Sequence, residues 1–346
     1  ALKLAMPIAV LSAMRESAQF HISVKGGRFL ENMAKADTIV FDKTGTLTYA
    51  TPTVAQIVPF GGRSDSEMLR LAACLEEHYP HSIANAVVAE AKKRGLDHQE
   101  YHSQVQYIVA HGISSMVDGH KVIIGSAHFV FEDEHCVVPE EEQDRFDALD
   151  PSYSHLYLCI GGSLAAVLCI SDPLRAEASE AIKALHDCGI ANVVMMTGDN
   201  HRTAQAVAKA VGVDEVHAEV LPEDKANFIR QAREQGHVVI MVGDGVNDSP
   251  ALSEADVGIA ISTGAAIAQE IADITVSSED LMALVTLRKL SCALMDRIHA
   301  NYRFIIGFNC GLIGLGLAGI LPPTTSALLH NTSTLAISMK SMTNLL

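Results

Sequence analysis

Asp42 is the residue of this sequence whose type and position most clearly indicate chemistry. It directly follows the apolar run 38–41 and opens the segment Asp42-Lys43-Thr44-Gly45-Thr46. A carboxylate placed there can attack a phosphoryl group and form an aspartyl phosphate. Because its own charge repels a phosphate, the reaction also needs Mg²⁺ and a lysine to neutralise the site.

Other stretches of the chain offer the groups that this reaction needs. Lys225 can provide the positive charge, and Asp244, in the run GDGVNDSP, can hold the metal. Thr197-Gly198-Asp199 offers a hydroxyl and backbone amides for phosphate oxygens. Taken singly, each aspartate could instead be a helix N-cap or a turn residue. Their shared position, directly after predicted strands, favours a single phosphoryl-transfer site.

The elements that must position these groups alternate as in a doubly wound parallel sheet, which makes the fold class α/β. Apolar runs at 38–41, 192–196 and 237–242 predict parallel strands covered on both faces. Segments 176–188, 202–211 and 223–235 predict the helices between them. Loops at the carboxyl ends of such strands form the site in this class of fold. We therefore expect one domain made of residues 38–49 and 163–290.

Residues 50–162 differ in character and predict an α+β domain inserted after the first strand. Helices are expected at 66–77 and 82–94, and strands at 105–109, 116–117 and 121–124. Asp118-Gly119 and Gly161-Gly162 predict hairpin turns. The acidic cluster 132–144 predicts a solvated surface.

The last part of the chain carries a run, 304–321, that has no charged residue and is rich in glycine. Its length is close to the ~20 residues that cross a bilayer, and glycines suit close packing of membrane helices. The basic residues that precede it predict a cytoplasmic flank. We expect two transmembrane helices in 291–346, and the end of a truncated membrane helix with a linker in 1–37. A buried helical hairpin of a soluble core is the alternative.

Composition excludes some classes of function. The formal net charge of −16 argues against nucleic-acid binding through a general positive field. The seven cysteines contain no Cys-x-x-Cys pair, so neither a disulfide scaffold nor a zinc ribbon is indicated.

The motifs DKTGTLT, TGDN and GDGVNDSPAL resemble those of the phosphorylation domain of P-type ATPases, which share a core with haloacid-dehalogenase phosphatases. Asp172-Pro173-Leu174-Arg175 resembles the family's Asp-Pro-x-Arg segment. The resemblance implies that ATP phosphorylates Asp42. It also implies that Mg²⁺ is held by Asp42, the Thr44 carbonyl and Asp244. The remaining catalytic residues that it implies are Lys43, Thr197, Gly198, Asp199, Lys225, Asn247 and Asp248.

Within the P-type ATPases, other motifs of this sequence resemble those of the heavy-metal pumps. Glu76 followed by His81-Ser82 is similar to their Glu and His-Pro signature, although serine stands where proline is usual. Gly112 matches the second glycine of the pair that follows. The resemblance implies an inserted domain that binds ATP through Glu76, His81 and Gly112, with Mg²⁺ and ATP as cofactors.

These features predict ATP-driven transport of a heavy-metal cation, with a divalent, zinc- or cadmium-like ion favoured. The alternatives are a copper-type pump or a dehalogenase-superfamily phosphatase. Thr44 stands where those phosphatases usually carry a second carboxylate, which disfavours rapid hydrolysis of the intermediate. By resemblance, His330 and Asn331 are candidate ligands of the transported ion, and hydrogen bonding to a neighbouring helix is their alternative role. We expect a bacterial plasma-membrane protein with cytoplasmic catalytic domains, whose partners are the cation, ATP and the lipid bilayer.

Overall fold

The computed structural model describes residues 2–49, 51–77, 82–96, 106–108, 112–244, 248–261, 270–277 and 280–346. The chain divides into two compact units. The first comprises residues 1–39, 183–191 and 229–346, and the second comprises residues 40–182 and 192–228.

The predicted α/β sheet has seven strands in the order β1-β13-β12-β11-β2-β9-β10. Its strands are β1 (Ile22–Val24), β2 (Thr38–Asp42), β9 (Asn192–Met196), β10 (Glu215–His217), β11 (Val239–Gly243), β12 (Val257–Ile261) and β13 (Ile274–Val276). β11, β12 and β13 pair in parallel, as do β9 and β10. β2 and β11 are buried along their whole length, as their continuous apolar runs predicted.

Three helices come directly before or after these strands in the chain, within two residues of the predicted bounds. They are α6 (Ala178–Asp187), α7 (His201–Val211) and α8 (Pro222–Glu234). Asn200 caps α7, since its side chain accepts a hydrogen bond from the Thr203 amide, and Gly212 ends the helix at φ 85°. The same fold contains α2 (Gly27–Lys35) and α9 (Ser249–Glu254). The predicted linker at the start of the chain contains β1, which pairs antiparallel with β13.

The inserted domain is built on an antiparallel six-stranded sheet with the order β3-β8-β7-β6-β5-β4. Its strands are β3 (Thr53–Pro59), β4 (Gln106–Ile108), β5 (Gly112–Val117), β6 (His120–Gly125), β7 (Ser154–Ile160) and β8 (Ser163–Ser171). Both predicted hairpin turns are confirmed, because Asp118-Gly119 joins β5 to β6 and Gly161-Gly162 joins β7 to β8. Since β8 pairs with both β3 and β7, this sheet extends to Ser171, beyond the expected boundary at 162.

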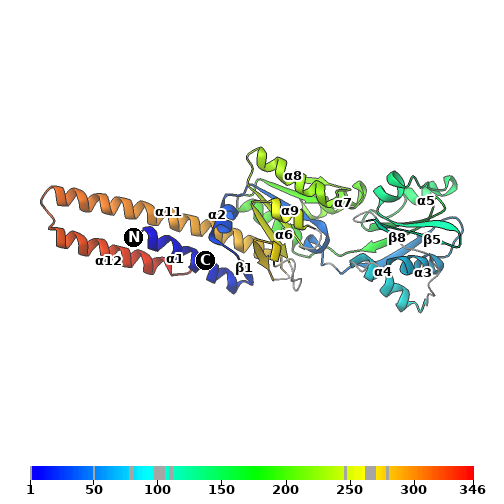
Figure 1. Ribbon diagram of the computed structural model, residues 1–346, viewed down its shortest axis with the longest axis horizontal. Coiled ribbons are helices and arrows are strands. Elements are labelled where there is room, and N and C mark those ends of the chain that lie inside the picture. The colour runs from blue at the N-terminus through cyan, green and yellow to red at the C-terminus, as the bar shows by residue number, and fades with distance from the viewer. Residues whose placement is uncertain are drawn as a thin grey trace. The chain divides into compact units, whose positions relative to one another are not determined.

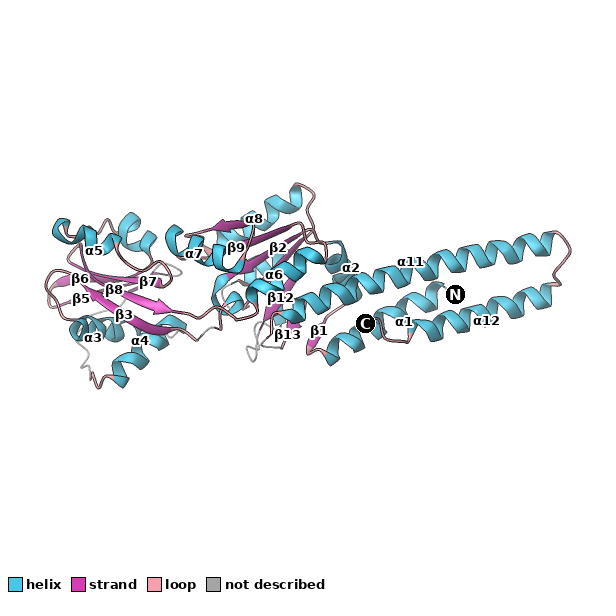
Figure 2. Cartoon of the chain, turned by 180° about the vertical axis from the view of Figure 1, so that it is seen from behind, coloured by secondary structure: helices cyan, strands magenta, loops and turns pink. Residues whose placement is uncertain are grey.

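Two hydrophobic cores cover the two faces of the inserted sheet. Helices α3 (Asp65–Glu76) and α4 (Ser82–Lys93) pack on one face through residues such as Leu69 and Val87. The other face carries η2 (His128–Asp133), η3 (Glu140–Glu142) and α5 (Gln143–Asp147), with Phe129 and Leu149 in its core (Figure 2). The acidic side chains of 132–144 are at least partly exposed, in line with the predicted solvated surface.

The last two helices, α11 (Met282–Leu317) and α12 (Pro323–Ser341), form a hairpin, and α1 (Leu2–Gln19) lies along it (Figure 1). Asn301 Nδ2 of α11 donates to Ser341 Oγ of α12 at 3.0 Å, and Ser12 of α1 donates to the Met342 carbonyl oxygen at 3.1 Å. In the part of the chain that the structure describes, no helix combines the length and the apolarity that a bilayer span requires.

Candidate active site

Asp42 ends strand β2, and its side chain forms an ion pair with Lys225 from the first turn of α8. Lys225 Nζ lies 2.6 Å from Asp42 Oδ1, and the two side chains are only 8% and 11% exposed. The strand brings the carboxylate to its carboxyl end, and the helix brings the ammonium to it. The structure therefore brings these two candidate residues together, with the lysine offsetting the negative charge of a candidate nucleophile.

The loop after Asp42 turns sharply at Gly45, whose φ of 74° suits glycine. The Thr48 hydroxyl accepts a hydrogen bond from the Gly45 amide at 2.9 Å and donates to the Asp172 carboxylate at 2.6 Å. Thr44 is half-buried within this turn at ψ 125°, outside the helical range. The turn thus holds the segment that follows the nucleophile in one conformation.

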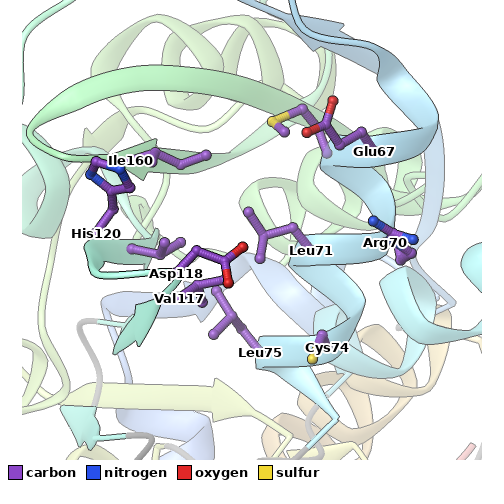
Figure 3. A pocket seen from close by; sticks show the side chains of 11 residues that line it. Glu67, Arg70, Leu71, Cys74, Leu75, Val117, Asp118, His120 and Ile160 are labelled. Carbon is purple, nitrogen blue, oxygen red and sulfur yellow. The ribbon is translucent and has the colours of Figure 1, made fainter. Parts of the chain in front are cut away.

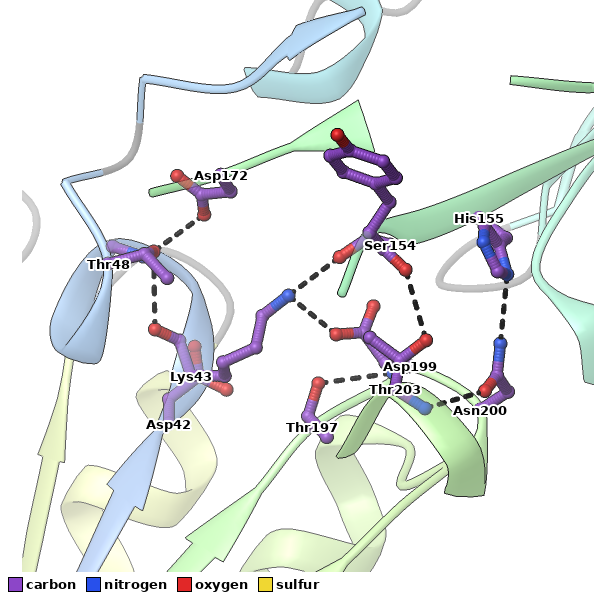
Figure 4. Close-up of polar contacts among 12 residues, drawn as sticks. Asp42, Lys43, Thr48, Ser154, His155, Asp172, Thr197, Asp199, Asn200 and Thr203 are labelled. Atoms are coloured by element: carbon purple, nitrogen blue, oxygen red, sulfur yellow. Dashed lines mark hydrogen bonds and ion pairs between the residues drawn. The ribbon is translucent and has the colours of Figure 1, made fainter. Parts of the chain in front are cut away.

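Lys43 points away from this turn and is buried in a polar cluster (Figure 4). Its Nζ lies 2.5 Å from Asp199 Oδ2 and 2.7 Å from Ser154 Oγ. The Asp199 amide donates to Thr197 Oγ1 at 3.1 Å, which fixes the loop after β9. The structure therefore brings three of the candidate residues, Lys43, Thr197 and Asp199, together with Ser154.

The segment that returns from the inserted domain also contacts the loop after Asp42. Arg175 Nε donates to the Thr46 carbonyl oxygen at 2.8 Å, and the Arg175 amide donates to the Leu47 carbonyl oxygen at 2.9 Å. Burial raises the pKa of the Asp172 carboxyl, while the hydrogen bond from Thr48 acts in the opposite direction. The Asp-Pro-x-Arg segment thus braces the loop that carries the candidate nucleophile.

Asp244 and Asp248 belong to the first unit, and Asp244 directly follows β11. Asp244 is half-buried and Asp248 is buried, while Asn247 lies outside the described residues. A side chain at Gly243 would place its Cβ 2.6 Å from Asp248 Oδ2, so a substitution there would displace the Asp248 side chain. The tight approach positions the Asp248 carboxylate directly against the end of the strand.

The donor set predicted for Mg²⁺ consists of the Asp42 and Asp244 carboxylates and the Thr44 carbonyl oxygen. All three are hard oxygen donors, the type that Mg²⁺ prefers. Among the residues that the structure describes, no cluster of three or more His, Cys, Asp or Glu side chains could hold a metal ion. By donor type alone, the residues predicted from the sequence suit Mg²⁺.

In the inserted domain, Glu76 is 2% exposed at the end of α3, and His81 lies outside the described residues. Gly112 starts β5, where a Cβ would lie 2.6 Å from Phe129 Cδ1 and would also meet the Ile124 carbonyl oxygen. This glycine is therefore required by packing, independently of any nucleotide. Sequence reasoning gave it only the nucleotide role.

A cavity of approximately 320 Å³ lies between α3 and the β5–β6 hairpin (Figure 3). Apolar side chains such as Leu71 and Leu75 line it, together with the charged side chains of Glu67 and Asp118. Neither Glu76 nor Gly112 is among the residues that line it. Glu76 and Gly112 therefore lie outside this cavity.

His330 and Asn331 lie on α12. His330 Nδ1 is 2.8 Å from Asn309 Oδ1 on α11, and Asn331 is exposed. The structure thus joins His330 to a residue, Asn309, that sequence reasoning missed. The polar type of Asn309 within an apolar run was the signal that could have found it.

Residues 36–256, more than half of the chain, match the sequence family described as haloacid dehalogenase-like hydrolase. The chain is 38% identical to "Probable copper-exporting P-type ATPase V" of Mycobacterium tuberculosis, over 99% of this chain and 44% of that protein. It therefore spans less than half the length of this relative.

Two solved structures are also similar. A zinc-transporting PIB-type ATPase in the E2.Pi state has a TM-score of 0.69 at 31% identity, covering 99% of this chain and 55% of that one. The catalytic domain of the CPx-ATPase CopB-B, studied for its conformational changes upon nucleotide binding, has a TM-score of 0.64 at 28% identity. That match covers 80% of this chain and 98% of the domain. The chain belongs to the haloacid dehalogenase-like hydrolases, and over nearly its whole length it is similar to heavy-metal P-type ATPases.

Proposed function

We propose that this chain is the catalytic part of an ATP-driven heavy-metal pump that is phosphorylated on Asp42. The observation that carries the proposal is the buried ion pair between Asp42 and Lys225, at the carboxyl end of a parallel strand. Names of similar proteins, a copper exporter and a zinc transporter, support the heavy-metal class.

In the proposed reaction, a carboxylate oxygen of Asp42 attacks the γ-phosphorus of ATP. A new O–P bond forms while the bond to the bridging oxygen breaks, and ADP leaves with that oxygen's electron pair. Lys225 lies against the attacking carboxylate and reduces its repulsion of the incoming phosphate. Mg²⁺, when held by Asp42, Asp244 and the Thr44 carbonyl, would neutralise charge on the phosphate oxygens.

ATP itself is proposed to bind the inserted domain near Glu76, His81 and Gly112. The similarity to a catalytic domain that responds to nucleotide supports this. The burial of Glu76 and the close packing at Gly112 place two of these residues on a rigid part of the domain.

The pump is proposed to lie in a bacterial plasma membrane with its catalytic domains in the cytoplasm, and α11 and α12 are proposed to contact the lipid although neither reaches the apolarity of a complete span. Large apolar side chains remain exposed along both helices: Leu317 is 86% exposed, and Leu328 and Leu335 are 66% and 62% exposed. Exposed apolar surface of this kind is suited to lipid. The basic residues Arg297 and Arg303 of α11 support the cytoplasmic orientation of the adjacent domains.

The transported ion is proposed to be a divalent transition metal, with monovalent copper as the alternative. His330 offers an imidazole nitrogen, a ligand suited to zinc, copper or nickel. Stimulation of ATPase activity by Zn²⁺, Cd²⁺ and Cu⁺ in turn would identify the ion in the complete protein.

Labelled ATP tests the proposal. The complete protein should form a phosphoenzyme that is stable in acid and labile to hydroxylamine, and Asp42→Asn should abolish it. Asp37→Asn is the matched control, since Asp37 lies just before the same strand, and it should leave labelling intact. Labelling that persists in Asp42→Asn would contradict the assignment.

A further inference from the structure

The inserted domain contacts the start of α7 through a series of hydrogen bonds. Thr203 Oγ1 donates to the Tyr153 carbonyl oxygen at 3.0 Å, and Asn200 Nδ2 donates to Tyr157 Oη at 3.3 Å. Arg202 Nη1 donates to the Asp147 carbonyl oxygen at 2.6 Å. The segment 199–203 therefore forms the hydrogen-bonded contact with the inserted domain within this unit.

Lys43 lies at the same junction. The residue is 4% exposed, and its ammonium donates both to Asp199, the first residue of that segment, and to Ser154, the first residue of β7. A cavity of approximately 290 Å³, lined by Lys43 and Ser154 among others, adjoins this contact. The lysine next to the candidate nucleophile thus has one partner from each of the two domains.

We propose that Ser154 is a positioning residue for phosphoryl transfer: from the inserted domain, its hydroxyl holds the Lys43 ammonium beside Asp199. This inference rests on the proposed phosphorylation of Asp42. Lys43 is covalently adjacent to Asp42, so a fixed ammonium restricts the backbone that aims the carboxylate. The position of the inserted domain and the alignment of Asp42 are then coupled through the hydrogen bond from Lys43 to Ser154.

The bond pattern of Ser154 favours this role over a purely structural one. Its backbone pairs with Ile170 in the sheet, so the strand does not depend on the hydroxyl. The hydroxyl accepts from a buried ammonium outside the sheet, at 2.7 Å. A hydrogen bond to a charged group is stronger than one between neutral groups. Its loss would leave the Lys43 ammonium with Asp199 but without the Ser154 hydroxyl.

The test compares Ser154→Ala, Ser154→Thr and Ser163→Ala in the complete protein. Ser154→Ala should slow phosphoenzyme formation from ATP about tenfold, the effect of losing one charge-assisted hydrogen bond, with the half-saturating ATP concentration unchanged. Ser154→Thr keeps the hydroxyl and should restore the rate. Ser163 lies at the opposite end of the β7–β8 hairpin, so Ser163→Ala should leave the rate of phosphoenzyme formation unchanged. Phosphorylation by inorganic phosphate uses the same Asp42 carboxylate, so Ser154→Ala should slow it as well, while Ser154→Thr and Ser163→Ala leave it unchanged.

A double-mutant cycle with Lys43→Met shows whether the effect acts through Lys43. Ser154→Ala should have no further effect in the Lys43→Met background. An equal loss in both backgrounds, or no recovery in Ser154→Thr, would overturn the proposal.

Amide hydrogen exchange separates this inference from the proposed function. Ser154→Ala should speed exchange in the segment 199–203 about tenfold, again only when Lys43 is present. If the unmodified protein forms no phosphoenzyme, the proposed function fails, while this measurement still supports or rejects the contact. Unchanged exchange in 199–203 would reject it.

Discussion

Lys225 Nζ lies 2.6 Å from Asp42 Oδ1, although 183 positions of sequence separate the two residues. The pair is buried and joins the end of a central strand to the first turn of a helix. Removing the lysine would leave a carboxylate whose charge opposes both its own burial and the approach of a phosphate.

Lys225→Met should therefore slow phosphoenzyme formation by about 10²-fold, the usual effect of losing one electrostatic partner at a reacting centre. Lys225→Arg keeps the charge and should retain part of the rate. The control is Lys209→Met, which removes an exposed lysine of α7. Labelling at the unmodified rate in Lys225→Met would exclude a role for this ion pair.

The Lys43–Asp199 ion pair should contribute to stability as well as to the site. Its side chains are 5% and 14% exposed. Asp199→Asn should lower the free energy of unfolding by about 3 kcal/mol, because it leaves the lysine charge buried with a weaker partner. Adding Lys43→Met should restore part of that loss, as measured by denaturant unfolding.

An exposed ion pair provides the comparison. Glu31 and Lys35 are about half exposed on α2, and Glu31→Gln should change the unfolding free energy by less than about 1 kcal/mol. If Asp199→Asn had an effect as small as Glu31→Gln, Lys43 would be adequately solvated without its partner.

Sequence reasoning placed candidate residues correctly relative to the strands where they follow continuous apolar runs. Asp42 and Asp199 each lie just where such a run ends, so their placement needed only the rule for parallel sheets. Sequence reasoning could not predict the role of Ser154. This serine opens an antiparallel strand 111 positions from Lys43, and no sequence pattern links the two residues. Edge strand β1 was missed for a related reason, since three residues of mixed polarity give too short an alternation.

His155 should contribute to the pH dependence of the free energy of unfolding. Burial lowers the pKa of this imidazole, and its Nε2 faces the Asp150 carbonyl oxygen at 3.1 Å. The folded state therefore favours the neutral ring, and between the lowered pKa and the ordinary value of about 6.5 the unfolded chain binds more protons. This contribution is present above that ordinary value and is lost as the pH falls towards the lowered pKa.

His155→Gln should accordingly reduce the fall in melting temperature between about pH 7 and pH 5. His120→Gln, an exposed histidine of β6, should leave that fall unchanged. Identical pH profiles for His155→Gln and the unmodified protein would mean that the buried ring does not govern this range.

Gly112→Ala should destabilise the inserted domain by about 1–3 kcal/mol, because the new Cβ would overlap the Ile124 carbonyl oxygen and Phe129. Phe129→Leu should not rescue it, since the backbone oxygen remains. Thermal unfolding without nucleotide is the measurement. Normal stability with weakened ATP binding would instead assign this glycine to nucleotide approach alone.

The contact between His330 and Asn309 leads to a prediction about metal selection. Asn309 Oδ1 is an acceptor, so this contact favours the tautomer that donates from His330 Nδ1, and that tautomer presents the Nε2 lone pair to a metal. A hydrogen bond of this type orients a ligating imidazole, and its loss typically weakens metal binding about 10- to 100-fold.

His330→Ala, Asn331→Ala and Asn309→Leu should each weaken metal-stimulated ATPase activity in the complete protein, with Asn309→Leu acting through the orientation of His330. Phosphorylation of Asp42 by inorganic phosphate should remain, because the three changes leave its ion pair with Lys225 untouched. His299→Ala, an exposed histidine of α11, is the control. Full metal stimulation in all three variants would place the ion away from α12, since neither the imidazole nor its supporting amide would then contribute to binding.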